Sequence, residues 1–119
     1  MDAKKFLQDY ARAWETRDAD LAASLFTSDA LYHETPFSEP MVGREAIRAY
    51  WEAATKNQKD IDVLIKEPHL DGNLLIAEWG TRYAHLSTGA RQELRGILLA
   101  EFEGDNVSSF REYWLHRSL

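Results

Sequence analysis

The sequence has 119 residues, of which 45% are hydrophobic and 12% aromatic, and its formal net charge is −6. This composition supports a hydrophobic core and excludes a disordered chain, and the length favours one domain over residues 1–119. We expect no nucleic-acid binding, because the chain is acidic and has no basic cluster. The absence of cysteine excludes disulfides and cysteine-based zinc sites, and it fits a cytoplasmic protein.

No stretch of the sequence predicts insertion into a membrane. No window approaches the roughly 20 apolar residues that a membrane-spanning helix needs. The N-terminal segment "MDAKKFLQDYARAW" has no uninterrupted apolar run and no small-residue cleavage site, so we expect no signal peptide.

Hydrophobic periodicity predicts helices first and strands afterwards. Apolar residues at helical spacing predict an amphipathic helix over residues 3–16, a shorter one capped by Asp18, and a third near residues 43–56. Residues 29–34, between the second and third helix, have the period of a strand. From residue 60 onward the turn signals "DGN", "STG" and "EGDN" separate further strands. The order α-α-β-α-β-β-β-β predicts an α+β domain with helices packed on one face of a curved sheet.

The last predicted strand, residues 107–116, places a carboxylate among aromatic side chains. By alternation Phe110, Glu112, Trp114 and His116 share one face, which we expect the helices to cover. Burial disfavours the ionised form of a carboxyl group unless a donor meets it. Glu112 is therefore a candidate general acid or base, or an anchor for a ligand. The alternatives are an ion pair with a nearby arginine and a solvated strand end, and His116 could either orient Glu112 or be solvated itself.

Glu34 is the second candidate. It ends the first predicted strand and precedes the loop "TPFSEPMVG", in which Pro36 and Pro40 restrict the backbone. A carboxylate held beside a stiff loop at the mouth of a cavity is suited to proton abstraction. The alternative is a surface glutamate at a strand end.

Motifs for metals, cofactors and nucleophiles are absent. Histidines 33, 69, 85 and 116 form no pair with the spacing of metal ligands, and no phosphate loop, dinucleotide fingerprint or GxSxG elbow occurs. We therefore expect no metal and no cofactor, although a metal site assembled across strands stays open. The four tryptophans come from four predicted elements, as core packing or a shared aromatic cavity requires.

Essentially the whole chain, residues 2–116, resembles the nuclear transport factor 2-like superfamily, and most closely its SnoaL-like (polyketide-cyclase-like) branch. The resemblance rests on the helix–helix–strand opening, on "GREAIRAYW" in the third helix and on "NVSSFREYW" in the last strand. It implies a cone-shaped roll of three helices on a strongly curved, mixed and mostly antiparallel sheet, with a deep pocket between them. It also implies a homodimer through the outer sheet face, where alternation places residues 91, 93 and 95 with Tyr113 and Leu115 on the exposed side.

Within this superfamily the region around Glu34 is most similar to ketosteroid isomerase. The pattern there is a strand, an acidic general base, a loop ending in "SEP", a glycine and "AIR". It matches Glu34, residues 38–40, Gly43 and residues 46–48 without a gap. The resemblance implies that Glu34 is the general base and that Tyr10, on the first helix, is the oxyanion-hole tyrosine.

One position departs from the isomerase. Its second oxyanion donor, a protonated aspartate, falls on Leu98. Loss of one such donor typically costs ~3 kcal/mol of transition-state stabilisation, which argues against steroid isomerisation in its usual form. Glu112, on the strand next to Leu98, could supply a replacement proton if it stays protonated in an apolar site. The Asp–Arg–Asp arrangement of limonene-epoxide hydrolase is not legible, although Arg82, Arg95 and Arg111 leave an accidental version open.

The sequence therefore predicts a pocket for a small apolar molecule, with an isomerase- or cyclase-like site in which Glu34 is the base and Tyr10 and Glu112 are polar partners. The residues expected to line it come from most of the predicted elements: Trp14, Tyr32, Phe37, Trp51, Trp79, Tyr83, Leu98, Phe110 and Trp114. Two alternatives stay open, since a fold does not settle a function: a non-catalytic ligand-binding or accessory module, and a protein-interaction dimer with a vestigial pocket.

Overall fold

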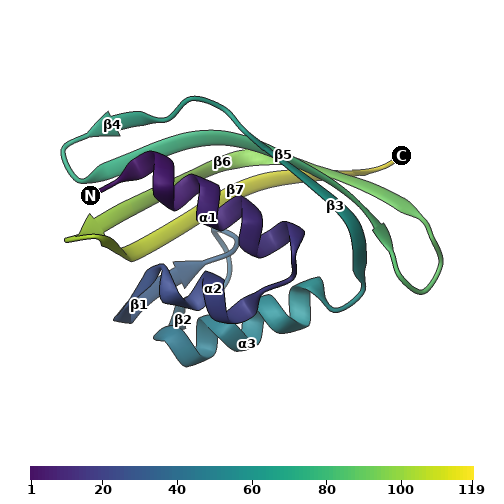
Figure 1. The fold of residues 1–119 in the computed structure, drawn as a ribbon, viewed down its shortest axis with the longest axis horizontal. Coiled ribbons are helices and arrows are strands. Elements are labelled where there is room, and N and C mark those ends of the chain that lie inside the picture. Colours follow the sequence, from purple (N-terminus) through teal and green to yellow (C-terminus); the bar gives the residue numbers. More distant parts are fainter.

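The computed structural model describes residues 1–119, in which three helices lie on one side of a seven-stranded sheet (Figure 1). The helices are α1 (Ala3–Glu15), α2 (Ala19–Ser24) and α3 (Arg44–Thr55). Aspartates cap the first two, since the side chain of Asp2 accepts from the Lys5 amide and that of Asp18 from the Leu21 amide, each at 3.0 Å. No helix has the length and apolar character that crossing a bilayer requires.

The sheet is mixed and mostly antiparallel, as predicted. Its strands are β1 (Phe26–His33), β2 (Met41–Val42), β3 (Gln58–Ile65), β4 (His69–Asp71), β5 (Leu74–His85), β6 (Arg91–Glu103) and β7 (Asn106–Ser118). Their order is β2-β1-β7-β6-β5-β3, with β4 paired to β5. Only β1 and β7 pair in parallel. The N-terminal strand thus lies beside the C-terminal one.

The main differences from the prediction concern three parts of the sheet, since the helix bounds differ by at most one residue and those of β7 by at most two. The first strand begins at Phe26 rather than at residue 29 and ends at His33, so Glu34 is the first residue beyond it. The two-residue strand β2 was not predicted, because two residues are too few to show a period. The predicted run over residues 60–70 is divided into β3 and β4 before Pro68, whose missing amide hydrogen cannot contribute to a strand ladder.

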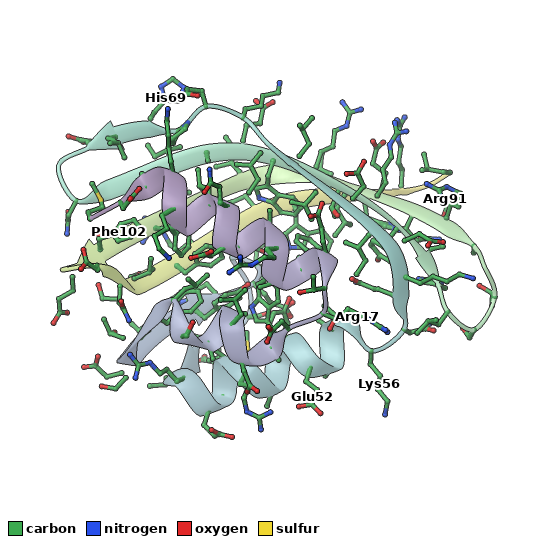
Figure 2. The ribbon with its side chains drawn as sticks, viewed as in Figure 1. Arg17, Glu52, Lys56, His69, Arg91 and Phe102 are labelled. Carbon is green, nitrogen blue, oxygen red and sulfur yellow. The ribbon has the colours of Figure 1, made fainter.

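The chain enters α3 directly from β2 through Gly43. Its φ of +89° is a conformation that side chains disfavour. Its amide donates to the Ala30 carbonyl at 2.8 Å, and a Cβ here would lie 3.2 Å from the Ser28 carbonyl oxygen. This close approach to β1 fixes where α3 starts. The charged side chains of Glu52 and Lys56 point away from the sheet (Figure 2).

An aromatic core fills one half of the space between helices and sheet. Phe6 of α1 packs there against Phe26, Phe102 and Phe110, with ring centroids 5.4–6.4 Å apart; Phe102 is labelled in Figure 2. One turn further along α1, Tyr10 marks the boundary of this core. Beyond Tyr10 the buried residues include the tryptophans Trp14, Trp51 and Trp79.

Candidate functional site

A cavity of about 390 Å³ lies beyond the aromatic core, between α1, α3 and the inner face of the sheet. Its lining is mainly aromatic and includes all four tryptophans and four of the five tyrosines. Most predicted site residues are among the lining residues: Tyr10, Trp14, Tyr32, Glu34, Trp51, Trp79, Tyr83, Glu112 and Trp114. The structure thus brings both candidate carboxylates into one cavity.

Three residues expected to line the cavity do not. Phe37 is 98% exposed and lies on an open groove of the outer sheet face, because the loop after β1 turns outward. Leu98 and Phe110 are fully buried in the core. Phe110 has the predicted orientation, but the Tyr32 ring stacks on it at a centroid distance of 4.7 Å and separates it from the cavity. For Phe37, Leu98 and Phe110 the prediction was wrong.

Glu112 is held by two tyrosine hydroxyls. Its side chain is almost fully buried, and its Oε1 accepts hydrogen bonds from the hydroxyls of Tyr10 and, at 3.5 Å, Tyr32. Its Oε2 has no protein partner and keeps exposed surface toward the cavity. Burial, together with the nearby charge of Glu34, raises the pKa of Glu112 to about 7, against the lowering effect of the hydrogen bonds from Tyr10 and Tyr32. A protonated Glu112 would therefore carry its proton on Oε2.

The Tyr10 hydroxyl is committed to Glu112. Burial and the Glu112 carboxylate raise the pKa of Tyr10 well above its usual value, so this hydroxyl stays protonated and donates. A hydroxyl has one proton to give. While this bond lasts, Tyr10 acts on a ligand through Glu112 rather than directly.

Glu34 is anchored by its backbone. Its carbonyl oxygen accepts a hydrogen bond of 2.8 Å from Trp114 Nε1, which ties the end of β1 to β7. The half-buried side chain lines the cavity. Across the cavity, burial, Glu112 and Glu34 together raise the pKa of Tyr50. Glu34 and Glu112 thus share their surroundings with Tyr10, Tyr32 and Tyr50.

Six lining residues were not assigned to the site from the sequence: Tyr50, Ala54, Thr55, Gln58, Leu94 and His116. Tyr50 could have been found, because it precedes Trp51 and lies three residues after the buried Ile47 on the same helix. Gln58 accepts a hydrogen bond of 2.8 Å from Trp14 Nε1. One interpretation of the sequence was that His116 orients Glu112. In the structure His116 is instead hydrogen-bonded to Gln92 at 2.5 Å.

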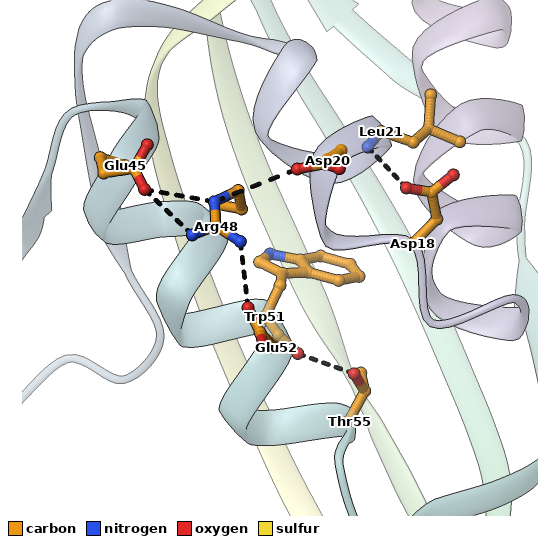
Figure 3. Close-up of polar contacts among 8 residues, drawn as sticks. All are labelled: Asp18, Asp20, Leu21, Glu45, Arg48, Trp51, Glu52 and Thr55. Atoms are coloured by element: carbon orange, nitrogen blue, oxygen red, sulfur yellow. Dashed lines mark hydrogen bonds and ion pairs between the residues drawn. The ribbon is translucent and has the colours of Figure 1, made fainter.

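Trp51, on α3, is held by packing against aromatic side chains of α1. Its ring contacts Tyr10 and Trp14 of α1 at centroid distances of 5.4 and 6.1 Å. Three residues before Trp51 on α3, Arg48 pairs with Glu45 and Glu52, each at 3.0 Å, and reaches Asp20 of α2 at 4.0 Å (Figure 3). Exposed pairs of this kind contribute little to stability, because water and salt screen the charges. They supplement the aromatic packing that holds α3 over the cavity.

Neither a metal centre nor an arginine-based site is assembled. No group of three or more histidine, aspartate or glutamate side chains could hold a metal ion. No arginine lines the cavity. Arg82 and Arg95 pair with Glu93, and Arg111 pairs with Glu101, on the outer face of the sheet. The Asp–Arg–Asp arrangement left open by the sequence is therefore not formed.

The sequence matches the family of the SnoaL-like domain over residues 7–110. The chain belongs to this family. No curated protein sequence matches it.

Solved structures share the fold at low sequence identity. A protein of Catenulispora acidiphila with a ketosteroid isomerase-like fold, in complex with trimethylamine, has a TM-score of 0.80 at 20% identity, over 91% of this chain and 83% of that one. A cystatin-fold protein of Novosphingobium aromaticivorans has a TM-score of 0.79 at 19% identity, over 95% and 98%. The epoxide hydrolase/cyclase-like enzyme SalBIII of salinomycin pyran ring formation has a TM-score of 0.84 at 15% identity, over 98% and 95%. At these identities the similarity establishes the fold and not the reaction.

Proposed function

We propose that the cavity binds a small molecule and that Glu34 acts there as a general base, in a proton transfer of the isomerase or cyclase type. The observation that carries the proposal is the pair of carboxyl groups, Glu34 and Glu112, in one aromatic cavity. Two acids whose surroundings differ can take opposite roles, one accepting and one donating a proton. Glu34 sits at the half-buried rim, and Glu112 is buried beneath tyrosine hydroxyls.

In this mechanism Glu112 supplies the donor that Leu98 cannot. Its Oε1 accepts from Tyr10 and Tyr32, so its own proton lies on Oε2 and points to the ligand. A donor fixed in a dry site stabilises negative charge that develops on a ligand oxygen as a base removes a proton. Tyr10 is then a positioning residue for Glu112. Leu98 lies directly across from Glu112 in the β6–β7 register, so the two positions are close in space.

Relatives support the same class of function. The chain is a SnoaL-like domain, and SalBIII, which shares its fold, is described as an epoxide hydrolase/cyclase-like enzyme. The Catenulispora protein has been solved with the small molecule trimethylamine. These likenesses favour a small-molecule pocket over a vestigial one.

Hydrogen exchange at the α-carbon of bound ketones tests the role of Glu34. Thermal shift against apolar ketones, steroids and epoxides first identifies a ligand. Glu34→Gln should then slow the exchange at least about 100-fold, because general base catalysis typically contributes that much. Glu39→Gln, an exposed charge in the same loop, should leave it unchanged. Exchange that survives in Glu34→Gln contradicts the base role, and ligand binding without exchange supports the non-catalytic alternative.

We also propose that the outer sheet face pairs with a second copy of the chain. Exposed apolar side chains there include Ile97, Tyr113 and Leu115, at 40%, 46% and 81% exposure, beside the exposed ring of Phe37. Exposed apolar patches of this kind favour association. The cytoplasmic location stays a prediction from the absence of cysteine.

A further inference from the structure

The cavity lining has a charge bias as well as an aromatic one. Four tryptophans and four tyrosines make up eight of its fifteen residues; two more are glutamates, and none is lysine or arginine. Tryptophan and tyrosine faces attract cations through the ring quadrupole, and carboxylates attract them directly. A purely apolar ligand would use only part of this lining.

We propose that the cavity binds a compact organic cation, an alkylammonium group, between its tryptophan and tyrosine rings, that of Tyr50 included, and its two carboxyl groups. The proposal rests on the small-molecule binding of the proposed function and names a ligand class for the same cavity. The donor role of Glu112 then applies to ligands without a cationic group, since a bound cation favours the ionised carboxylate. An alkylammonium group has an apolar surface around a positive centre. It therefore suits both the aromatic walls and Glu34 with Glu112.

The aromatic rings form separate walls rather than one stack. The rings of Trp14 and Trp51 meet at 77° and those of Trp14 and Trp79 at 59°, with centroids 6.1 and 5.4 Å apart. A cation within about 6 Å of several centroids gains from each ring. Rings in tilted or edge-to-face contact cover less of one another's faces than parallel stacked rings do, so more ring face is left for a ligand in the cavity.

Both carboxyl groups lack a cationic partner in the protein. Neither Glu34 nor Glu112 takes part in any ion pair. Glu112 is only 5% exposed, and its Oε2, which faces the cavity, has no hydrogen-bond partner. An ammonium group in the cavity would supply the missing partner.

Binding of a cation should release the proton of Glu112. The titratable groups that face Glu112 are Tyr10 from α1, Tyr50 from α3, Tyr32 and Glu34 from β1 and its end, and His116 from β7. None is a fixed positive charge, so the cation would be the main group favouring ionised Glu112. With a pKa of about 7, Glu112 is mostly protonated at pH 6 and mostly ionised at pH 8. Cation affinity should then rise about tenfold from pH 6 to pH 8.

A matched pair of probes tests the proposal. Choline and its neutral carbon isostere 3,3-dimethylbutan-1-ol have the same shape, and the tryptophan fluorescence of the cavity reports binding of either. At pH 8 choline should bind at least about tenfold more tightly than the isostere. Equal or tighter binding of the isostere overturns the cation proposal and leaves the small-molecule pocket intact. Binding of neither probe overturns both.

Substitutions distinguish the contribution of an aromatic ring to choline binding from that of the Glu112 carboxylate. Tyr50→Phe keeps the ring and should keep choline affinity, whereas Tyr50→Leu removes the ring and should weaken choline binding at least about threefold more than isostere binding. Glu112→Gln should abolish most of the pH dependence. Histidine can also change its charge near neutral pH, so His116→Gln serves as the matched control and should retain that dependence.

Circular dichroism confirms that each variant folds. If Glu112→Gln does not fold, the Tyr50 pair still decides the proposal. Equal choline affinity in Tyr50→Phe and Tyr50→Leu overturns the aromatic contribution, and an unchanged pH dependence in Glu112→Gln overturns the role of Glu112.

Discussion

Glu112 and Glu93 lie on the neighbouring strands β7 and β6, on opposite faces of one sheet, and each is only 5% exposed. On the inner face, burial without a cationic partner raises the pKa of Glu112 to about 7. On the outer face, hydrogen bonds from Arg82 and Arg117 lower the pKa of Glu93 to about 2. Equal side-chain exposure therefore goes with opposite charge states at neutral pH, because Glu112 lies in the interior and Glu93 lies under arginine side chains at the surface of the sheet. Depth and partners together decide the charge state, and the deep carboxylate that lacks a cation marks the candidate site.

The ion pairs of Glu93 on the outer face join neighbouring strands. Glu93 receives Arg82 at 3.0 Å, Arg117 at 2.5 Å and Arg95 at 3.4 Å. These arginines come from three adjacent strands, so they tie β5, β6 and β7 together. Alternation placed Glu93 on the outer face, where it lies, but its side chain is not exposed there, because the arginine side chains cover it.

The largest loss of stability should come from a clash between β6 and β7, the strands that carry Glu93 and Glu112. A Cβ on Gly96 of β6 would lie 2.3 Å from the Tyr113 carbonyl oxygen and 2.8 Å from Trp114 Cβ, both on β7. Gly96→Ala should therefore shift β6 against β7 and lower the free energy of unfolding by about 3 kcal/mol in urea titrations. Gly80→Ala is the control, since its Cβ would be 3.6 Å from the nearest atom, an ordinary contact. Equal losses in both variants would contradict the argument.

The pH dependence of stability should show Glu112 directly. Because its pKa is raised from 4.5 to about 7, the folded state keeps a proton that the unfolded state loses, so stability falls as pH rises through this interval. Glu112→Gln lacks this loss. Its free energy of unfolding relative to the parent should increase by about 3 kcal/mol between pH 4 and pH 8. A difference independent of pH would show that Glu112 is not desolvated as described.

Glu93 should show the opposite sign and a smaller effect. Its pKa is lowered from 4.5 to about 2, so its contribution is present above pH 4.5 and is lost as pH falls toward 2. Glu93→Gln should thus be less stable than the parent at pH 7 and equal to it near pH 2, in urea titrations. The arginines are 52–70% exposed, so solvent screens the pairs and 1 M salt should shrink the difference. An undiminished difference near pH 2 would rule out the ionised pair as its source.

The smallest change in the free energy of unfolding should come from a substitution that prevents the proposed dimer from forming. Leu115→Asp places a charge on the proposed dimer face, and because the side chain is 81% exposed, its cost to the folded chain should stay within about 0.5 kcal/mol. Light scattering should show a dimer for the parent and a monomer for the variant. Leu86→Asp, in the turn after β5, is the exposed control and should leave the dimer intact. A monomeric parent would exclude the dimer.

Long regular elements were predictable from the sequence, and contacts between elements were not. The alternation of β7 placed Glu112 and Trp114 on the inner face, because a strand period of two needs only local information. The exclusion of Phe110 from the cavity depends on the Tyr32 ring, and the burial of Glu93 depends on arginines from neighbouring strands. Those facts follow from sheet register, which no local pattern in this chain reveals.

The parallel pairing of β1 with β7 also determines when this protein can first work. The hydrogen bond between Tyr10 and Glu112 spans 102 positions of the chain. A ribosome that adds about 5–20 residues per second would release the aromatic helix faces seconds before the strand that completes them. A nascent chain that stops short of β7 has neither the partner of β1 nor Glu112. The ligand binding proposed for this cavity therefore has to wait until β7 has been synthesised and has paired with β1.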